Sequence, residues 1–153
     1  MAKAYQDPED IRNWQRRPDG ITTSGKLGPS DPERLARIGV KHVINLALDD
    51  HPEALRDEAE LLAKAGIAYT HIPVPFGEPD TGHVNQFRQA IREANGPVHV
   101  HCIMNYRVTA FLYLLDLEDG VPQEEAQTRM AKIWDPFNSE EPMAQPWKKL
   151  LSR

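Results

Sequence analysis

The sequence predicts an α/β fold: a single domain with a central, mainly parallel sheet of four to five strands and helices on both faces. Its 153 residues are the size of one ordinary domain. Its composition, 40% hydrophobic and 27% charged, is typical of a globular protein. Short β-branched runs alternate along the chain with helical patterns, and this order is typical of a parallel sheet covered by helices.

The N-terminal part predicts a short helix followed by a strand. Residues 9–17 place Ile11 and Trp14 on one helical face. A Pro-Asp-Gly turn at 18–20 ends this helix, and residues 21–24 then form an edge strand.

The remaining elements follow from apolar periodicity between proline and glycine signals. Strands are predicted over 41–48, 67–73 and 98–101, and those near Val43, Ile67 and Val98 are expected at the centre of the sheet. Helices are predicted from a cap at Ser30 or Asp31 to Gly39, and over 52–65, 83–94, 107–117, 122–134 and 143–151. The last two are expected to pack on the outside of a domain that spans 1–153.

Charge and composition exclude several classes of function. With 18 basic and 23 acidic residues the net charge is −5, and without a basic block the chain is not expected to bind nucleic acid or a membrane surface. No apolar run approaches a membrane span, and no secretory signal is visible, so a cytoplasmic protein is expected. One cysteine excludes an internal disulfide, and the six histidines lack ligand spacing, so we expect no metal and no cofactor. The oligomeric state is left open.

Ligands of such sheets bind beyond the carboxyl ends of the strands. Four segments satisfy that rule: residues 25–30, 49–51, 73–82 and 102–107.

The segment 102–107 carries the clearest chemistry. Cys102 is the first residue after a predicted strand, and Arg107 opens the next helix. The free amides and the positive end of that helix both stabilise a thiolate. The same amides, together with the planar guanidinium, can hold a three-oxygen anion over the sulfur. This arrangement favours in-line attack of the thiolate on a phosphoryl group.

Several further motifs accompany the cysteine and arginine in a fixed order. They are Ser24-Gly25, VINL at 43–46, HIPV at 71–74 and GPVHVHC at 96–102. Together they resemble a bacterial branch of the cysteine-dependent protein tyrosine and dual-specificity phosphatases, the branch related to the phosphatase-like domain of beta-lactamase hydrolase-like proteins. The resemblance covers about residues 21–117.

The resemblance implies a role for each matching residue. Cys102 is the nucleophile that forms a cysteinyl-phosphate, and Arg107 binds the phosphate of a phosphorylated protein or small molecule. The phosphate-binding amides are those of Ile103, Met104, Asn105, Tyr106 and Arg107. His101 holds the loop through the backbone, Thr109 steadies the thiolate or aids breakdown of the intermediate, and Asp80 is the general acid.

The loop departs from the usual phosphatase pattern. Only four residues separate Cys102 from Arg107, and none of them is glycine. Asn105 tolerates left-handed backbone best, which requires Ile103 and Met104 to point into the core. The four-residue spacing also fits a rhodanese-like sulfurtransferase, and the missing glycine fits a degenerate fold that binds an anion or a partner.

Two assignments near the site have alternatives. Glu78 shares the loop of Asp80 and is the second candidate for the acid. His99 and His101 are expected on opposite faces of their strand, with His99 in the core.

Overall fold

The computed structural model describes residues 6–152 and contains one five-stranded sheet in the order β1-β2-β5-β3-β4. The strands are β1 (Gln15–Arg16), β2 (Thr22–Ser24), β3 (His42–Asn45), β4 (Ala68–His71) and β5 (Val98–His101). β1 pairs antiparallel with β2, and all other pairs are parallel. The predicted α/β fold with a mainly parallel sheet is confirmed.

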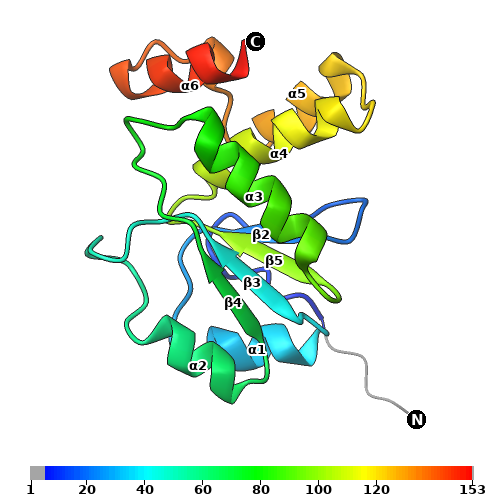
Figure 1. The fold of residues 1–153 in the computed structure, drawn as a ribbon, viewed down its shortest axis with the longest axis vertical. Coiled ribbons are helices and arrows are strands. Elements are labelled where there is room, and N and C mark those ends of the chain that lie inside the picture. The colour runs from blue at the N-terminus through cyan, green and yellow to red at the C-terminus, as the bar shows by residue number, and fades with distance from the viewer. Residues whose placement is uncertain (1–5, 153) are drawn as a thin grey trace.

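Helices cover both faces of this sheet, as predicted (Figure 1). They are α1 (Asp31–Arg37), α2 (Glu58–Lys64), α3 (Thr81–Glu93), α4 (Tyr106–Glu118), α5 (Gln123–Ala131) and α6 (Gln145–Leu151). Two 3₁₀ turns, Pro136–Asn138 and Pro142–Ala144, connect α5 to α6. In Figure 1, α1 and α2 lie below the sheet, and the other four helices lie on its opposite side.

Each face has its own apolar core, because successive residues of a strand point to opposite sides. On the side of α1 and α2, Val43 packs with Leu35 and Leu62. On the side of α3 to α6, Ile44 and Val100 pack with a larger set of residues that includes Phe87, Phe111 and Trp147. The larger core therefore joins the C-terminal helices to the sheet.

The predicted helix over residues 9–17 is wrong. This segment forms turns and then strand β1, and Asn13 has a left-handed backbone with φ 52°. The amide of Asn13 donates to the carbonyl of Met104, while Trp14 stacks on the ring of His99. A three-residue spacing of Ile11 and Trp14 fits such a turn as well as a helix, and the tertiary contacts select the turn.

The predicted positions of two strands in the sheet are also wrong. β4, which follows Ile67, is an edge strand, because it pairs with β3 alone within residues 6–152. β2 is internal, because β1 covers its outer side. Local sequence cannot order strands whose partners lie far away along the chain.

The helix predicted over 52–65 is shorter than expected. Turns occupy residues 49–57, and α2 begins only after Asp57, whose φ of 58° is incompatible with a helix. The strand-end segment before α2 is therefore long enough to form one wall of a pocket.

No helix within residues 6–152 has the length and apolar character needed to cross a membrane.

Candidate active site

Cys102 lies at the carboxyl end of the sheet, directly after β5. β5 sits between β2 and β3, so the cysteine leaves the sheet near its middle, and its side chain is fully buried. Cys102 and Arg107 line the same pocket of about 410 Å³. The other lining residues are Leu48, His51, Phe76, Ile103, Met104, Tyr106 and Met143. Three of the four strand-end segments named from the sequence thus meet in one place.

The loop between Cys102 and α4 adopts its conformation without a glycine. Asn105 supplies the left-handed residue, with φ 70°. The side-chain amide nitrogen of Asn105 donates to the carbonyl of Asn13 at 2.8 Å and to Oγ1 of Thr23 at 2.9 Å. Ile103 is buried as expected, but the expectation for Met104 is wrong, because 37% of that residue is exposed at the pocket.

The carbonyl groups of this loop are held from outside the pocket. The carbonyl of Ile103 accepts from the backbone N–H of Lys26 at 2.9 Å and from Arg12 at 3.4 Å. A Cβ atom on Gly25 would collide with this carbonyl oxygen, which explains the glycine after Ser24. Within residues 6–152, no hydrogen bond uses the backbone N–H groups of residues 103–107. These five amides, in the loop and the first turn of α4, form an arrangement suited to an anion.

Arg107 brings a buried cation to the same pocket. Only 7% of the residue is exposed, its Nη1 donates to the carbonyl of Val74 at 2.9 Å, and its guanidinium lies 5.7 Å from the Phe76 ring centroid. Its Nε has no partner within the described residues. A buried guanidinium with a spare donor is suited to binding an anion, because an unpaired buried polar group is costly.

His99 and His101 lie on one face of β5, so the expectation of opposite faces is wrong. Residues two apart in a strand share a face, and the two rings stack with centroids 6.3 Å apart. The nitrogens of His99 lie 2.8 Å from the hydroxyl groups of Thr22 and of Ser24. Burial, and next the neighbouring His101, lower the pKa of His99 well below its usual value, so this ring is neutral.

His101 connects the loop to α2. Its Nδ1 lies 3.3 Å from the carbonyl oxygen of Cys102, which is the backbone contact that the resemblance implies. Its Nε2 lies 2.6 Å from a carboxylate oxygen of Glu58, the first residue of α2. Sequence reasoning missed Glu58, because it lies on a helix distant in sequence and belongs to none of the motifs.

Comparison with known families agrees with this geometry. Residues 16–115 match the family described as "Beta-lactamase hydrolase-like protein, phosphatase-like domain". The chain belongs to this family. Over 103 residues it is 30% identical to the beta-lactamase hydrolase-like protein of Xylella fastidiosa, an alignment that covers 65% of this chain and 24% of the relative. The phosphatase-like domain thus spans about a quarter of the length of these curated relatives.

Solved structures show the same fold. A DUF442 protein from Shewanella putrefaciens CN-32 is 32% identical with a TM-score of 0.80, over 95% of this chain and 93% of that one. A cysteine-to-serine variant of TpbA from P. aeruginosa, solved with phosphotyrosine, is 23% identical with a TM-score of 0.62, over 83% and 75% of the chains. The chain therefore contains a phosphatase-like domain with the fold of the cysteine phosphatases.

Two residues assigned to the site by resemblance lie outside the pocket of the phosphatase-like domain. Asp80 caps α3: its carboxylate accepts from the N–H of His83 at 2.9 Å, and the side chain of His83 bonds back to the N–H of Asp80. Asp80 and Glu78 line a separate hollow of about 570 Å³. The hydroxyl of Thr109 donates to the carbonyls of Asn105 and Tyr106, so it steadies the start of α4.

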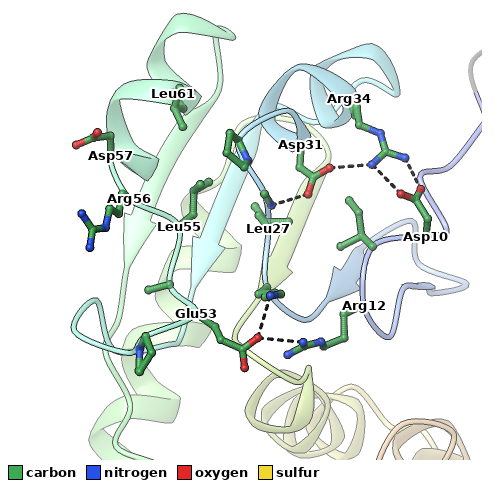
Figure 2. A pocket seen from close by; sticks show the side chains of 16 residues that line it. Asp10, Arg12, Leu27, Asp31, Arg34, Glu53, Leu55, Arg56, Asp57 and Leu61 are labelled. Atoms are coloured by element: carbon green, nitrogen blue, oxygen red, sulfur yellow. Dashed lines mark hydrogen bonds and ion pairs between the residues drawn. The ribbon is translucent and has the colours of Figure 1, made fainter.

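A larger hollow of about 900 Å³ is lined in part by residues 52–57, which follow β3 and precede α2 (Figure 2). Glu53 bridges Lys26 at 2.9 Å and Arg12 at 3.0 Å, and these two cations hold its pKa at about 2. This hollow contains neither Cys102 nor Arg107. Its ion pairs instead anchor the segment whose His51 lines the cysteine pocket.

Proposed function

We propose that the phosphatase-like domain hydrolyses phosphomonoesters through a cysteinyl-phosphate on Cys102. The observation that carries this proposal is the pairing of a buried thiol with a buried Arg107 in one pocket, beside a loop whose amides are unused. A trigonal phosphoryl group presents three oxygens, which those amides and the guanidinium can bind as charge develops.

The reaction has two displacement steps. In the first, the Cys102 thiolate attacks phosphorus, a sulfur–phosphorus bond forms, and the ester phosphorus–oxygen bond breaks with its electron pair on the leaving oxygen. A general acid protonates that oxygen. In the second, water attacks phosphorus and the sulfur–phosphorus bond breaks. The general acid, now deprotonated, takes a proton from the attacking water. Phosphate leaves, and the thiolate is restored.

Asp80 is our proposed general acid, and this role requires its loop to approach the pocket. Asp80→Asn is expected to lower kcat by roughly 10²–10⁴ for alkyl phosphates, whose leaving groups need a proton, and by less for nitrophenyl phosphate. Glu78→Gln is the matched control from the same loop. Equal slowing of both substrates by Asp80→Asn, or no slowing, would exclude this acid, and loss in Glu78→Gln would transfer the role to Glu78.

The lining of the pocket indicates the class of ester. Apart from Cys102, His51 and Arg107 its side chains are apolar or aromatic, and Met143 is 52% exposed. One cation suits one phosphoryl group, and an apolar rim suits an aryl leaving group. We therefore propose an aryl phosphomonoester, such as phosphotyrosine in a protein or a small aryl phosphate, and the phosphotyrosine bound to TpbA supports this choice.

A second candidate function is transfer of sulfur. No aspartate or glutamate lines the Cys102 pocket within residues 6–152, and the loop has the four-residue spacing. In this reaction the Cys102 thiolate attacks the outer sulfur of thiosulfate, the sulfur–sulfur bond breaks, and sulfite leaves. A persulfide forms on Cys102, and no general acid is needed.

One pair of assays separates these functions. The wild-type chain is expected to hydrolyse nitrophenyl phosphate, and Cys102→Ser to abolish turnover while phosphate still binds, because a serine hydroxyl is not ionised. Full hydrolysis by Cys102→Ser would exclude the cysteine mechanism. Turnover of thiosulfate without hydrolysis of the aryl phosphate would favour the sulfurtransferase, and neither turnover with retained phosphate binding would favour a degenerate anion-binding fold.

A further inference from the structure

Glu58 is a buried carboxylate with no assigned role. Only 6% of the residue is exposed, and Nε2 of His101 lies 2.6 Å from its Oε2. Its other oxygen accepts from the amide of Asn45 at 3.4 Å. Within residues 6–152, the ion pairs of the structure give Glu58 no cationic partner except His101. A buried carboxylate needs such a partner, because an uncompensated buried charge is strongly destabilising.

The two contacts of the His101 ring indicate its protonation state. One nitrogen faces the Glu58 carboxylate, and the other faces the carbonyl oxygen of Cys102, at 2.6 and 3.3 Å. Both partners accept hydrogen bonds, whereas a neutral imidazole has a single N–H. Only the doubly protonated ring can donate to both an ionised carboxylate and a carbonyl.

We propose that Glu58 is a positioning residue that holds His101 as an imidazolium, which fixes the Cys102 carbonyl and places a cation beside the thiolate. The inference rests on Cys102 being the nucleophile of the proposed function. Without Glu58, a neutral His101 would keep the contact to the loop but would lose the charge. Without His101, the Glu58 charge would oppose formation of the thiolate.

The surrounding groups agree with a charged pair at this position. The ring centroid of His99 lies 6.3 Å from that of His101, and burial, followed by the neighbouring His101, lowers the pKa of His99, so His99 adds no second positive charge here. Tyr69, which accepts from Asn45 at 3.1 Å, has its pKa raised to about 12 by burial and next by the negative charge of Glu58. Asp49 adds a smaller effect of the same sign on Tyr69. The other ring stacked near Tyr69 is that of His71, which bonds to the carbonyl of Ala47.

The test measures the thiolate directly. Cys102 is the only cysteine of the chain, so alkylation by iodoacetamide as a function of pH reports on this thiol alone. In Glu58→Gln the amide can still donate to Nε2, so His101 stays oriented but neutral. We expect the midpoint of alkylation to rise by about one pH unit, a tenfold loss of thiolate at a given pH below it. Tyr69→Phe is the control, because it removes a hydroxyl from the same network without changing charge, and its midpoint should match the wild type.

Two further measurements complete the test. In a His101→Asn background, Glu58→Gln should no longer raise the midpoint, because the effect passes through the imidazolium. If Glu58→Gln does not fold, the ring nitrogens of the wild-type chain can be examined by ¹⁵N NMR near neutral pH. Two protonated nitrogens on His101 are the expected result. A neutral His101, or an unchanged midpoint in folded Glu58→Gln, would overturn the proposal, and neither result depends on which substrate the domain uses.

Discussion

The two faces of strand β5 differ sharply in chemistry, although they belong to the same four residues. Val98 and Val100 point into the core beneath α3 and α4, whereas His99 and His101 point toward α1 and α2. All four are buried. Burial alone therefore does not determine what a residue contributes to this fold. The valine face contributes packing energy, and the histidine face contributes directed hydrogen bonds.

The apolar face extends to the wall of the pocket that contains Cys102 and Arg107. Phe111 packs against Phe87 and Trp147, with ring centroids 5.8 and 5.6 Å apart. Trp147 also donates from its indole nitrogen to the carbonyl of Phe76 at 2.8 Å, and Trp134 stacks on Tyr106 at 4.9 Å. Trp147 of α6 and Trp134 of the connection after α5 therefore hold two aromatic residues of the pocket lining, Phe76 and Tyr106, in place.

The polar face works through paired donors and acceptors. The ring nitrogens of His99 and His101 each have a partner, and the oxygen of the Asn45 side chain accepts from the N–H of Ala47. A buried polar network is stabilising only when its members are satisfied. This network fixes the orientation of the His99, His101 and Asn45 side chains. A fixed orientation is needed where β5 turns into the Cys102 loop.

The largest expected effect is on stability and tests the apolar face. Phe111→Ala removes a fully buried ring and is expected to lower the free energy of unfolding by about 3–5 kcal/mol, measured by urea denaturation. Phe111→Leu, which keeps most of the volume, is the control and should cost less. A loss below about 1 kcal/mol for the alanine variant would show that this face does not carry the packing energy.

The next largest effect is on catalysis. Arg107 lies on α4, on the apolar side of the sheet, and lines the Cys102 pocket. Arg107→Lys is expected to lower kcat/KM for an aryl phosphate by roughly 10²–10³, because an ammonium cannot form two parallel bonds to phosphoryl oxygens. Arg88→Lys, on the exposed face of α3, is a matched control. Full activity in Arg107→Lys would exclude the guanidinium from the phosphate site.

Because buried His99 lies on the polar face, we expect the free energy of unfolding to depend on pH. The pKa of His99 is lowered in the folded state, so the unfolded chain binds the extra proton more readily. The stabilisation is therefore complete above about pH 6.5 and is lost as pH falls below it, by up to about 1.4 kcal/mol per pH unit. His42, whose pKa is also lowered by burial, contributes with the same sign. Denaturation between pH 5 and 7.5 should show this slope, and His99→Gln should flatten it more than His42→Gln does; equal slopes in all three proteins would contradict the prediction.

The sequence predicted much of the molecule, and its failures have physical reasons. Local periodicity located the strands β3, β4 and β5 and the helices α3 and α4, because their apolar residues repeat at the right spacing. It placed Cys102 and Arg107 at one strand end, which the structure confirms. It failed for residues 9–17, where contacts with His99 and Met104 override the local pattern. It also missed Glu58, whose partner His101 lies 43 positions away.

The smallest expected effect concerns the residue that replaces glycine in the loop. Asn105 combines a left-handed backbone with two side-chain hydrogen bonds, and the two contributions can be separated. Asn105→Gly and Asn105→Ala both lose the hydrogen bonds, but only the alanine also places a Cβ in the left-handed region. The alanine variant is therefore expected to be less stable than the glycine variant by about 1 kcal/mol, measured by urea denaturation. Equal stability of the two would mean that the loop relaxes out of the left-handed conformation. In that case its amides could not keep the arrangement that we propose for the phosphoryl group, and aryl phosphatase activity should fall in both variants alike.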